Sequence, residues 1–275
     1  MLDAPPRAAL GAPAALPAPC AIFSDAHLGV GARERERETA RFLRGLAGRA
    51  RSLLVNGDLF DFWFEWRSVA PRGHFRTLAA LADLRDAGVE ILMIAGNHDC
   101  WGGSELTADV GLTYHLGAWD GEIAGWRAHV EHGDGLRQRE DRRYRALRRV
   151  IRHPLSIRAF RWLHPDFGAW LARGSSDASR MHRARDGGAG LRAAALAWTA
   201  AHPDTELVVF GHSHVSVLER ATPVSVYANP GAWLDAPTYL LVRPERIELR
   251  QWSGSAEGDL LHALDRRAEE VLAQS

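Results

Sequence analysis

The sequence contains no lysine, so all 34 of its basic residues are arginine, and 34 acidic residues balance them. The absence of lysine excludes lysine Schiff-base chemistry and a P-loop in which a lysine holds nucleotide phosphates. The formal net charge of zero argues against bulk electrostatic attraction to nucleic acid. We therefore expect no nucleic-acid partner, and no pattern in the sequence points to a protein partner.

Cysteine is scarce, and long apolar runs are missing. Cys20 and Cys100 are too few for a disulfide framework, which favours a reducing compartment. No stretch approaches the roughly 18 to 20 apolar residues that a membrane span needs. Near the N-terminus, Asp3 and several prolines interrupt the apolar stretch that a signal peptide would require, so we expect residues 1–18 to be a mobile tail. The predicted protein is soluble or at most lies on a membrane surface.

The chain of 275 residues is long enough for one large domain with an insertion. Short apolar runs that end on polar residues predict strands, namely "CAIF", "SLLV", "EILMIA", "AHV" and "LVVF". Helical patterns between several of them favour an α/β fold with helices packed over a sheet. After Ala221, closely spaced strand patterns predict antiparallel strands, and "EGDLLHALDRRAEEVLAQ" predicts a C-terminal helix.

The segment 136–188 shows no convincing strand and has arginine-rich helical periodicity. We predict that it is a helical cap inserted between two parts of one core, residues 19–135 and 189–275. Residues 137–152 hold eight arginines against two acids, which fits a solvated helix face or contact with anionic lipid or phosphate groups. Phe160, Trp162, Phe167 and Trp170 fall at near-helical spacing, which fits either core packing or the wall of an acyl-chain groove.

Oxygen or imidazole donors follow each of the five predicted strands. The successive segments are "SDAHLG", "NGDLFD", "GNHD", "EHGD" and "GHSH". In open α/β sheets, ligands gather beyond the carboxyl ends of strands, so we expect these loops to converge on one cavity. The candidate metal ligands are Asp25, His27, Asp58, Asn97, His132, His212 and His214.

Seven donors are more than one tetrahedral ion requires, and they suit two divalent ions that share one carboxylate. We predict Asp58 as the bridge, because a carboxylate can give each ion an oxygen. Carboxylate, amide and imidazole ligands without a thiolate indicate manganese, with iron or zinc as alternatives. Such a pair of ions would activate water for in-line attack on a phosphorus centre.

These motifs resemble those of the calcineurin-like metallophosphoesterases, over roughly residues 20–235. The resemblance implies a two-layer β-sandwich flanked by helices, and thus an α/β (α+β) fold with a helical cap insertion. It further implies that one metal ion is held by Asp25, His27, Asp58 and His214. It implies that the second is held by Asp58, Asn97, His132 and His212.

"GDLFDFWFEW" and the arginine-rich insertion are similar to the UDP-2,3-diacylglucosamine diphosphatases of lipid A biosynthesis. That resemblance implies cleavage of a lipid–nucleotide pyrophosphate to UMP and 2,3-diacylglucosamine 1-phosphate. It also implies a cytoplasmic protein, peripheral at the inner membrane. The substrate contacts that it implies are Asn97, His98, Tyr144, Arg173, Ser176 and Arg180. The sequence departs from this subfamily at His98, where several members have arginine and the wider superfamily has histidine.

We predict that His98 and Asp99 are catalytic. His98, oriented by Asp99, would give a proton or a charge-assisted hydrogen bond to the phosphoryl or leaving oxygen. Asp61 is a candidate to hold the distal N–H of a ligand histidine.

Two other functions stay open. One is a general phosphomonoesterase or phosphodiesterase of the same superfamily, which His98 favours. The other is a non-catalytic scaffold, which would be expected to have lost ligands that this sequence retains. A nuclease is disfavoured because the chain lacks a broad basic stripe.

Overall fold

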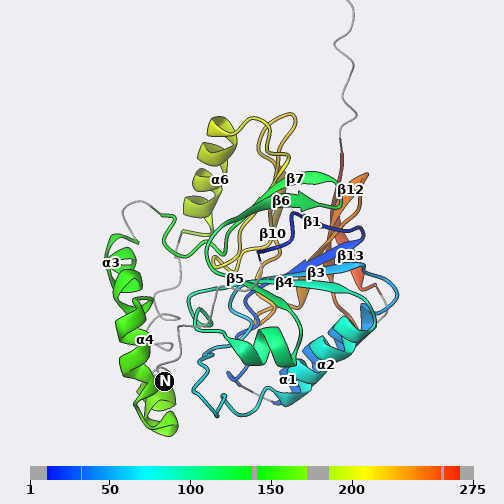
Figure 1. Ribbon diagram of the computed structural model, residues 1–275. Helices are drawn as coiled ribbons and strands as arrows, with labels where there is room; N and C mark the ends of the chain where they lie inside the picture. The colour runs from blue at the N-terminus through cyan, green and yellow to red at the C-terminus, as the bar shows by residue number, and fades with distance from the viewer. Residues whose placement is uncertain (1–10, 32, 138–140, 172–185, 255–256, 267–275) are drawn as a thin grey trace, which may run out of the picture.

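The computed structural model describes residues 11–31, 33–137, 141–171, 186–254 and 257–266. Two β-sheets are stacked face to face, and helices cover the outer face of each (Figure 1). The predicted two-layer β-sandwich flanked by helices is confirmed.

The larger sheet has seven strands in the order β13-β12-β11-β2-β3-β4-β5. Its parallel half consists of β2 (Cys20–Phe23), β3 (Ser52–Asn56), β4 (Glu90–Ile94) and β5 (Thr113–His115). Its antiparallel half consists of β11 (Thr238–Val242), β12 (Arg246–Gln251) and β13 (Asp259–Asp265). The antiparallel strands predicted after Ala221 are thus present.

The smaller sheet has six strands in the order β1-β6-β7-β8-β10-β9. Their bounds are β1 (Ala15–Leu16), β6 (Trp119–Ile123), β7 (Trp126–Val130), β8 (Leu207–Val209), β9 (Val217–Arg220) and β10 (Val226–Asn229). Strand β8 pairs in parallel with β7 and with β10, so these strands point their carboxyl ends the same way.

Alternation along the strands builds three apolar layers. On β3, Leu54 faces the core between the sheets, whereas Leu53 and Val55 face the helices. On β8, Val209 likewise faces the core between the sheets and Val208 faces the helix beyond the smaller sheet. Because successive strand residues point to opposite faces, the apolar residues of strands such as β3 and β8 stabilise two layers at once.

Helices α1 (Arg33–Gly45) and α2 (Phe75–Asp86) cover the outer face of the larger sheet, and α6 (Ala189–Ala201) covers the smaller one (Figure 1). In α1, Ala40, Leu43 and Phe42 are buried, while the arginine–glutamate run at its start is exposed or half-buried. A single π-helical turn, η1 (Glu105–Asp109), lies between β4 and β5.

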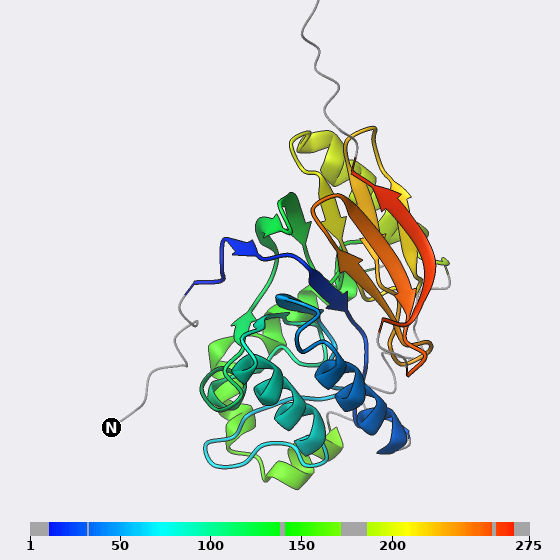
Figure 2. The same cartoon turned by 90° about the vertical axis from the view of Figure 1, so that its right-hand side faces the viewer.

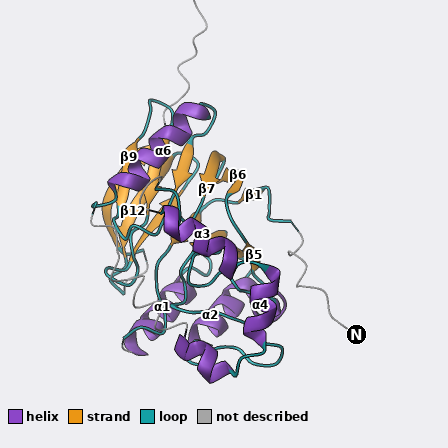
Figure 3. Cartoon of the chain, turned by 90° about the vertical axis from the view of Figure 1, so that its left-hand side faces the viewer, coloured by secondary structure: helices purple, strands orange, loops and turns teal. Residues whose placement is uncertain are grey.

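Part of the predicted cap segment is helical. Helices α3 (Arg142–Ile151) and α4 (Pro154–Arg161) lie together on one side of the molecule, in front of the loops that join the sheets (Figure 3), and residues 165–171 are also helical. The cap bounds of 136–188 stay a prediction, because residues 138–140 and 172–185 lie outside the described part of the chain.

Both ends of the described chain differ from expectation. Residues 15 and 16, placed in the predicted tail, form β1, which pairs in parallel with β6 and buries Leu16. The predicted C-terminal helix is wrong over residues 259–265, which form β13 at the edge of the larger sheet (Figure 2). Here pairing with the free edge of β12 and packing of Leu264 against the core override a local helical pattern.

Candidate metal centre

The structure brings together side chains that follow four of the strands. Two groups of possible ligand atoms have members within 4.8 Å of one another: one contains Asp25, His27 and His214, the other Asp58, His132 and His212. These residues follow β2, β3, β7 and β8, whose carboxyl ends come from both sheets. The two histidines of "GHSH" therefore lie in different groups.

Close contacts join the two groups. In the first, His27 Nε2 is 3.3 Å from His214 Nε2, and His214 Nε2 is 3.4 Å from Asp25 Oδ1. In the second, His132 Nε2 is 3.2 Å from Asp58 Oδ2. The same Asp58 oxygen is 3.7 Å from His27 Nε2, so Asp58 lies between the groups, as a bridging carboxylate must.

The backbone at these positions is strained. Five of the six non-glycine residues with positive φ among the described residues are candidate ligands, with φ between 43° and 61°; they are Asp25, His27, Asp58, His212 and His214. Residues held in this sparsely populated region cluster at functional sites. The turns aim side chains sideways from the strand ends, where they meet those of neighbouring loops.

Two glycines allow these loops to approach one another closely. A Cβ at Gly57 would lie 2.2 Å from His132 Nδ1, and Gly57 itself has a φ of +82°. A Cβ at Gly96 would lie 2.1 Å from Asp58 Oδ1. Any side chain at either position would displace a candidate ligand.

Each carboxylate gives one oxygen to the backbone and directs the other inward. The backbone N–H of His212 donates to Asp25 Oδ2 at 3.0 Å, and that of His98 donates to Asp58 Oδ1 at 2.9 Å. His132 follows the same rule, since its Nδ1–H donates to Asn56 O at 2.9 Å and leaves Nε2 inward. The tautomer is thereby fixed by the backbone.

Several inward atoms are buried without a hydrogen-bond partner, including Asp25 Oδ1, Asn97 Oδ1 and His132 Nε2. Buried polar atoms are normally paired, and these three are the oxygen and imidazole donors that a divalent cation accepts. The residues present therefore fit a divalent metal centre, with Asn97 adding an amide oxygen to the carboxylates and imidazoles.

The charges of the cluster are strongly coupled. Burial alone would raise the pKa of Asp58, but His132, His98 and His27 lower it well below its usual range. Burial would lower the pKa of His132, and Asp58 beside it raises it well above its usual range. Burial and the charge of His132 lower the pKa of His212. These shifts have the directions expected of carboxylates and imidazoles buried side by side.

His98 faces the cluster but is oriented differently from the prediction. Its Nδ1–H donates to the backbone oxygen of Asp61 at 2.8 Å, and its Nε2 is 4.0 Å from Asp58 Oδ2. His98 also forms a group of possible ligand atoms with His27 and Asp58. The carboxylate of Asp61 lies 3.6 Å from His27 Nδ1, which is beyond hydrogen-bond distance. Asp61 therefore lies next to two histidines of the site and accepts a hydrogen bond from His98.

The carboxylate of Asp99 is occupied by the backbone. Oδ1 accepts the N–H of Gly96 at 2.8 Å and that of Asp58 at 3.3 Å, while Oδ2 accepts those of Leu59 at 2.8 Å and Phe60 at 3.4 Å. Orientation of His98 by Asp99 is therefore replaced by orientation from Asp61. Asp99 instead ties the loop after β4 to the loop after β3.

Two further carboxylates contact the site without having been singled out from the sequence. His214 Nδ1 lies 3.1 Å from Asp235 Oδ2, which orients that imidazole. Asp134 accepts the hydroxyl of Tyr144 at 2.6 Å and the guanidinium groups of Arg148 at 3.2 Å and Arg152 at 3.3 Å. The only sequence signal for Asp134 was its place two residues after His132, in "HGD".

The arginine-rich segment is divided between interior and surface. Arg152 donates to Gly96 O at 3.2 Å and so joins α3 to the loop that carries Asn97 and His98. The hydroxyl of Tyr144 is engaged with Asp134, and burial together with Asp134 raises the pKa of Tyr144. Arg142 and Arg149 are exposed. The predicted contacts Arg173, Ser176 and Arg180 lie outside the described residues.

The cap aromatics are mostly on the surface. Only Phe160 packs against the buried cluster of Phe62, Phe64 and Trp66, with its ring centroid 4.7 Å from that of Phe64. Trp162 is 91 % exposed and Trp170 is 67 % exposed. Core packing, one of the two interpretations of this set, therefore holds for Phe160 and fails for the two tryptophans.

The sequence model of the calcineurin-like phosphoesterase family matches residues 18–216, and the chain belongs to that family. With its carboxylate and imidazole cluster, it is a metal-dependent hydrolase.

Named relatives agree with this family. The chain is 34% identical over 215 residues to a protein named UDP-2,3-diacylglucosamine hydrolase from Porphyromonas gingivalis, covering 70% of this chain and 82% of that one. A protein of the same name from Proteus mirabilis is 28% identical over 243 residues, covering 85% of this chain and 99% of that one. A solved structure of a dimetal phosphatase from Danio rerio superimposes with a TM-score of 0.45 at 12% identity, over 90% of this chain and 98% of that one.

Proposed function

We propose that the chain hydrolyses the pyrophosphate of UDP-2,3-diacylglucosamine to UMP and 2,3-diacylglucosamine 1-phosphate with two divalent ions, manganese first among them. The observation that carries this proposal is the cluster of carboxylate, amide and imidazole donors with unpaired inward atoms. Similarity over most of the chain to proteins named for that substrate supports the choice of substrate.

One ion would be held by Asp25, His27, Asp58 and His214, and the other by Asp58, Asn97, His132 and His212. The two groups of close donor atoms support this division, and the position of Asp58 between them supports a shared carboxylate. When bound, two such ions activate water and neutralise charge on the phosphoryl oxygens. Ligands of this kind accept manganese, iron or zinc.

His98 would act on the phosphoryl or leaving oxygen. Because its Nδ1–H is held by Asp61 O, its Nε2 is the nitrogen on the side of Asp58. As an imidazolium it can donate from Nε2 to an oxygen of the substrate. As the oxygen of water bonds to phosphorus and the water gives up a proton to solvent, the bond to the bridging oxygen breaks, and that oxygen leaves with the electron pair on the sugar phosphate.

A leaving sugar phosphate is stable as an anion, so it depends less on protonation than an alkoxide does. We expect His98→Ala to reduce turnover of an alkyl phosphate much more than that of a pyrophosphate. An equally steep loss with both substrates would refute the proton-donor role.

The cap supports a position at the inner face of a cytoplasmic membrane. Trp162 is 91 % exposed and Leu155 is 65 % exposed, and Arg158 of the same helix and Arg149 of α3 are also exposed. Exposed aromatics beside arginines suit the interface of an anionic bilayer. No helix among the described residues is both long and apolar enough to span a membrane. Co-sedimentation with anionic but not zwitterionic vesicles, weakened in Trp162→Ala, tests the proposal.

The central test is release of UMP from UDP-2,3-diacylglucosamine in detergent by purified protein supplied with manganese. The matched control is Asp58→Asn, which removes the proposed bridging carboxylate while keeping the size of the side chain. No UMP release together with brisk cleavage of simple phosphodiesters would favour the general phosphoesterase, the function that a histidine at position 98 supports. No cleavage of any phosphoester would favour the scaffold.

A further inference from the structure

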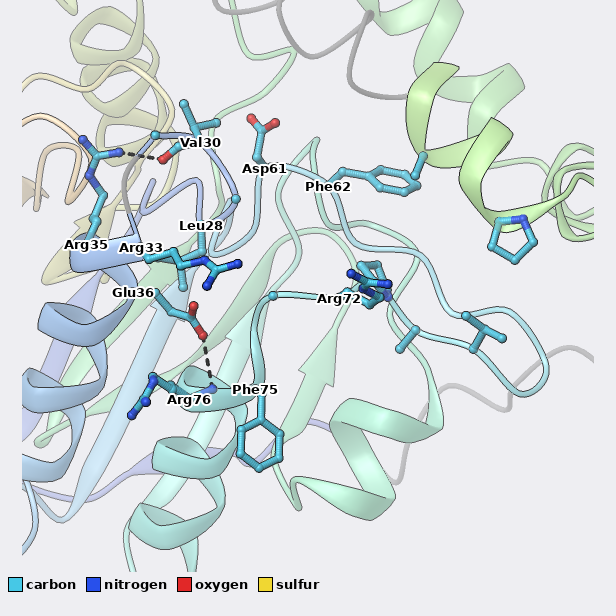
Figure 4. Close-up of a pocket in the computed structure, with 18 of the residues that line it drawn as sticks. Leu28, Val30, Arg33, Arg35, Glu36, Asp61, Phe62, Arg72, Phe75 and Arg76 are labelled. Atoms are coloured by element: carbon cyan, nitrogen blue, oxygen red, sulfur yellow. Dashed lines mark hydrogen bonds between the residues drawn. The ribbon is translucent and has the colours of Figure 1, made fainter.

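A cavity of about 890 Å³ lies beside the loops after β2 and β3, which also carry His27 and Asp58 (Figure 4). Its walls come from the loop after β2, the start of α1, the loop after β3 and the start of α2, and Pro165 and Ala169 of the cap also line it. Asp61 lies at its inner end, and the carboxylate of Asp61 is 3.6 Å from His27 Nδ1. A volume of this size is typical of a small-molecule site.

Two guanidinium groups line this cavity without a protein partner. Within the described part of the chain, Arg33 and Arg72 form no hydrogen bond or ion pair, and Figure 4 shows both reaching into the space below Asp61. Arg35, in contrast, is held by Val30 O at 2.8 Å. Guanidinium groups beside a cavity suit a phosphate, whereas an acyl chain in the same place would remove them from water without compensation.

An aromatic ring is available in the same cavity. Phe75, the first residue of α2, is 81 % exposed and lines the wall. Its neighbour along the helix, Arg76, donates its backbone N–H to Glu36 Oε1 at 3.1 Å, which fixes the start of α2 against α1. An exposed ring at the start of a fixed helix can stack on a nucleobase with little loss of conformational entropy.

We propose that this cavity binds the nucleoside monophosphate arm of the substrate, with Arg33 and Arg72 on its phosphate side and Phe75 stacked on its base. The proposal rests on the proposed function, because it assigns a place to one half of that substrate. In-line displacement sends the two arms of a pyrophosphate away from phosphorus in different directions. Helix α3 of the cap is bound to Asp134, two residues after His132, whereas most of the cavity wall comes from the loops and helix starts of the core, which favours the cavity for the nucleotide arm.

The first test is calorimetric binding of UMP to the manganese-loaded protein. We expect Arg33→Ala/Arg72→Ala to weaken UMP binding by about tenfold or more, because it removes charge-assisted contacts. The control is Arg44→Ala/Arg49→Ala, which removes the same positive charge from exposed positions outside the cavity and should leave UMP affinity within about twofold of the wild type.

The second test separates base from phosphate. Phe75→Leu is expected to weaken UMP binding by about fivefold or more and to leave ribose 5-phosphate binding unchanged, because only UMP has a base to stack. Equal UMP binding by the wild type and the Arg33/Arg72 variant, or no UMP binding by the wild type, would overturn the proposal. Loss of 2,3-diacylglucosamine 1-phosphate binding with UMP binding intact would also overturn it, since the cavity would then hold the lipid arm.

These outcomes differ from failure of the proposed function. Without pyrophosphatase activity, the wild type would release no UMP from UDP-2,3-diacylglucosamine, whatever its affinity for free UMP. A cavity that does not hold the nucleotide would leave UMP release intact and make UMP affinity insensitive to Arg33, Arg72 and Phe75.

Discussion

Replacing Asp99 by asparagine tests whether this carboxylate builds the metal centre or acts through His98. The side chain is fully buried and accepts hydrogen bonds from four backbone N–H groups. Each carboxylate oxygen accepts one of them at 2.8 Å. An amide keeps only one of these oxygens, so it loses one short charge-assisted hydrogen bond, worth about 1.5–3 kcal/mol. Its NH₂ group then faces a backbone N–H that has no acceptor, which costs about 1–3 kcal/mol. We expect the free energy of unfolding to fall by about 1–3 kcal/mol, because the amide also removes a buried charge that Asp58 repels and so offsets part of this loss.

The assay compares denaturant unfolding with manganese affinity at pH 8. Burial and the charge of Asp58 raise the pKa of Asp99 to about 7, so the carboxylate is ionised at that pH. Because Asp99 holds the loops of Asp58 and Asn97, its replacement should also weaken manganese binding. Glu65→Gln is the matched control, since buried Glu65 accepts the N–H groups of Gly103 at 2.7 Å and Glu105 at 3.0 Å away from the metal loops. It should lose stability and keep its manganese affinity.

The reasoning fails if Asp99→Asn keeps the stability and manganese affinity of the wild type and loses only turnover. That result would restore Asp99 as the partner of His98.

Three other perturbations follow from the same contacts. Gly57→Ala should destabilise the protein and weaken manganese binding, because a Cβ would lie 2.2 Å from His132 Nδ1. The control is Gly48→Ala, where φ is +74° and no atom lies within 4 Å of the added Cβ. In denaturant unfolding, Gly48→Ala should lose only about 1–2 kcal/mol, which is the cost of the backbone strain. Asp134→Asn should speed tryptic cleavage within the cap, whereas Asp166→Asn, whose side chain is 97% exposed, should not. Removal of manganese by a chelator should lower the melting temperature by about 8 °C, relative to protein in which free manganese is at about a thousand times its dissociation constant. An unchanged melting temperature would contradict a fold that the metal stabilises.

The convergence of the candidate ligands was largely predictable because these residues follow a simple rule of topology. Strands β2, β3 and β4 run parallel in one sheet, and β7 and β8 run parallel in the other. Donors placed directly after such strands meet at the same edge whatever the details of packing. Strand ends marked by apolar runs were therefore enough to bring Asp25, Asp58 and His132 into one prediction.

Contacts between distant loops were not predictable in the same way. The partner of His98 is a backbone oxygen 37 positions away, at Asp61, and it depends on the path of a loop rather than on residue type. The link between His214 and Asp235 and the anchoring of the cap on Asp134 likewise depend on the final packing. From the sequence, the neighbouring carboxylate of Asp99 is the expected partner of His98. That prediction is wrong, because the buried carboxylate of Asp99 accepts hydrogen bonds from backbone amides instead.

At the C-terminus, the local pattern and the tertiary context disagree. Residues 259–265 include leucine, alanine and histidine in an order that a helix tolerates. Strand β12 offers an unpaired edge, and β13 covers it over its whole length, with an irregularity between Leu249 and Arg250. Pairing with β13 provides hydrogen-bond partners for the backbone groups at the edge of β12, which a separate helix would leave exposed. This contribution depends on a distant strand, so the local sequence pattern of residues 259–265 does not indicate it.

The strain of the ligand loops argues for catalysis over a purely structural role. Left-handed backbone at residues such as Asp25 and His214 costs of order 1 kcal/mol at each position, and a buried atom without a partner, such as Asn97 Oδ1, costs about 1–3 kcal/mol more. Such costs persist only where another interaction offsets them. A divalent cation is the partner that satisfies several inward lone pairs at once, so the arrangement is stable when loaded. A scaffold that had lost its reaction would be free to relax these turns and fill the cluster with paired or apolar side chains, yet five of the seven candidate ligands keep a positive φ here.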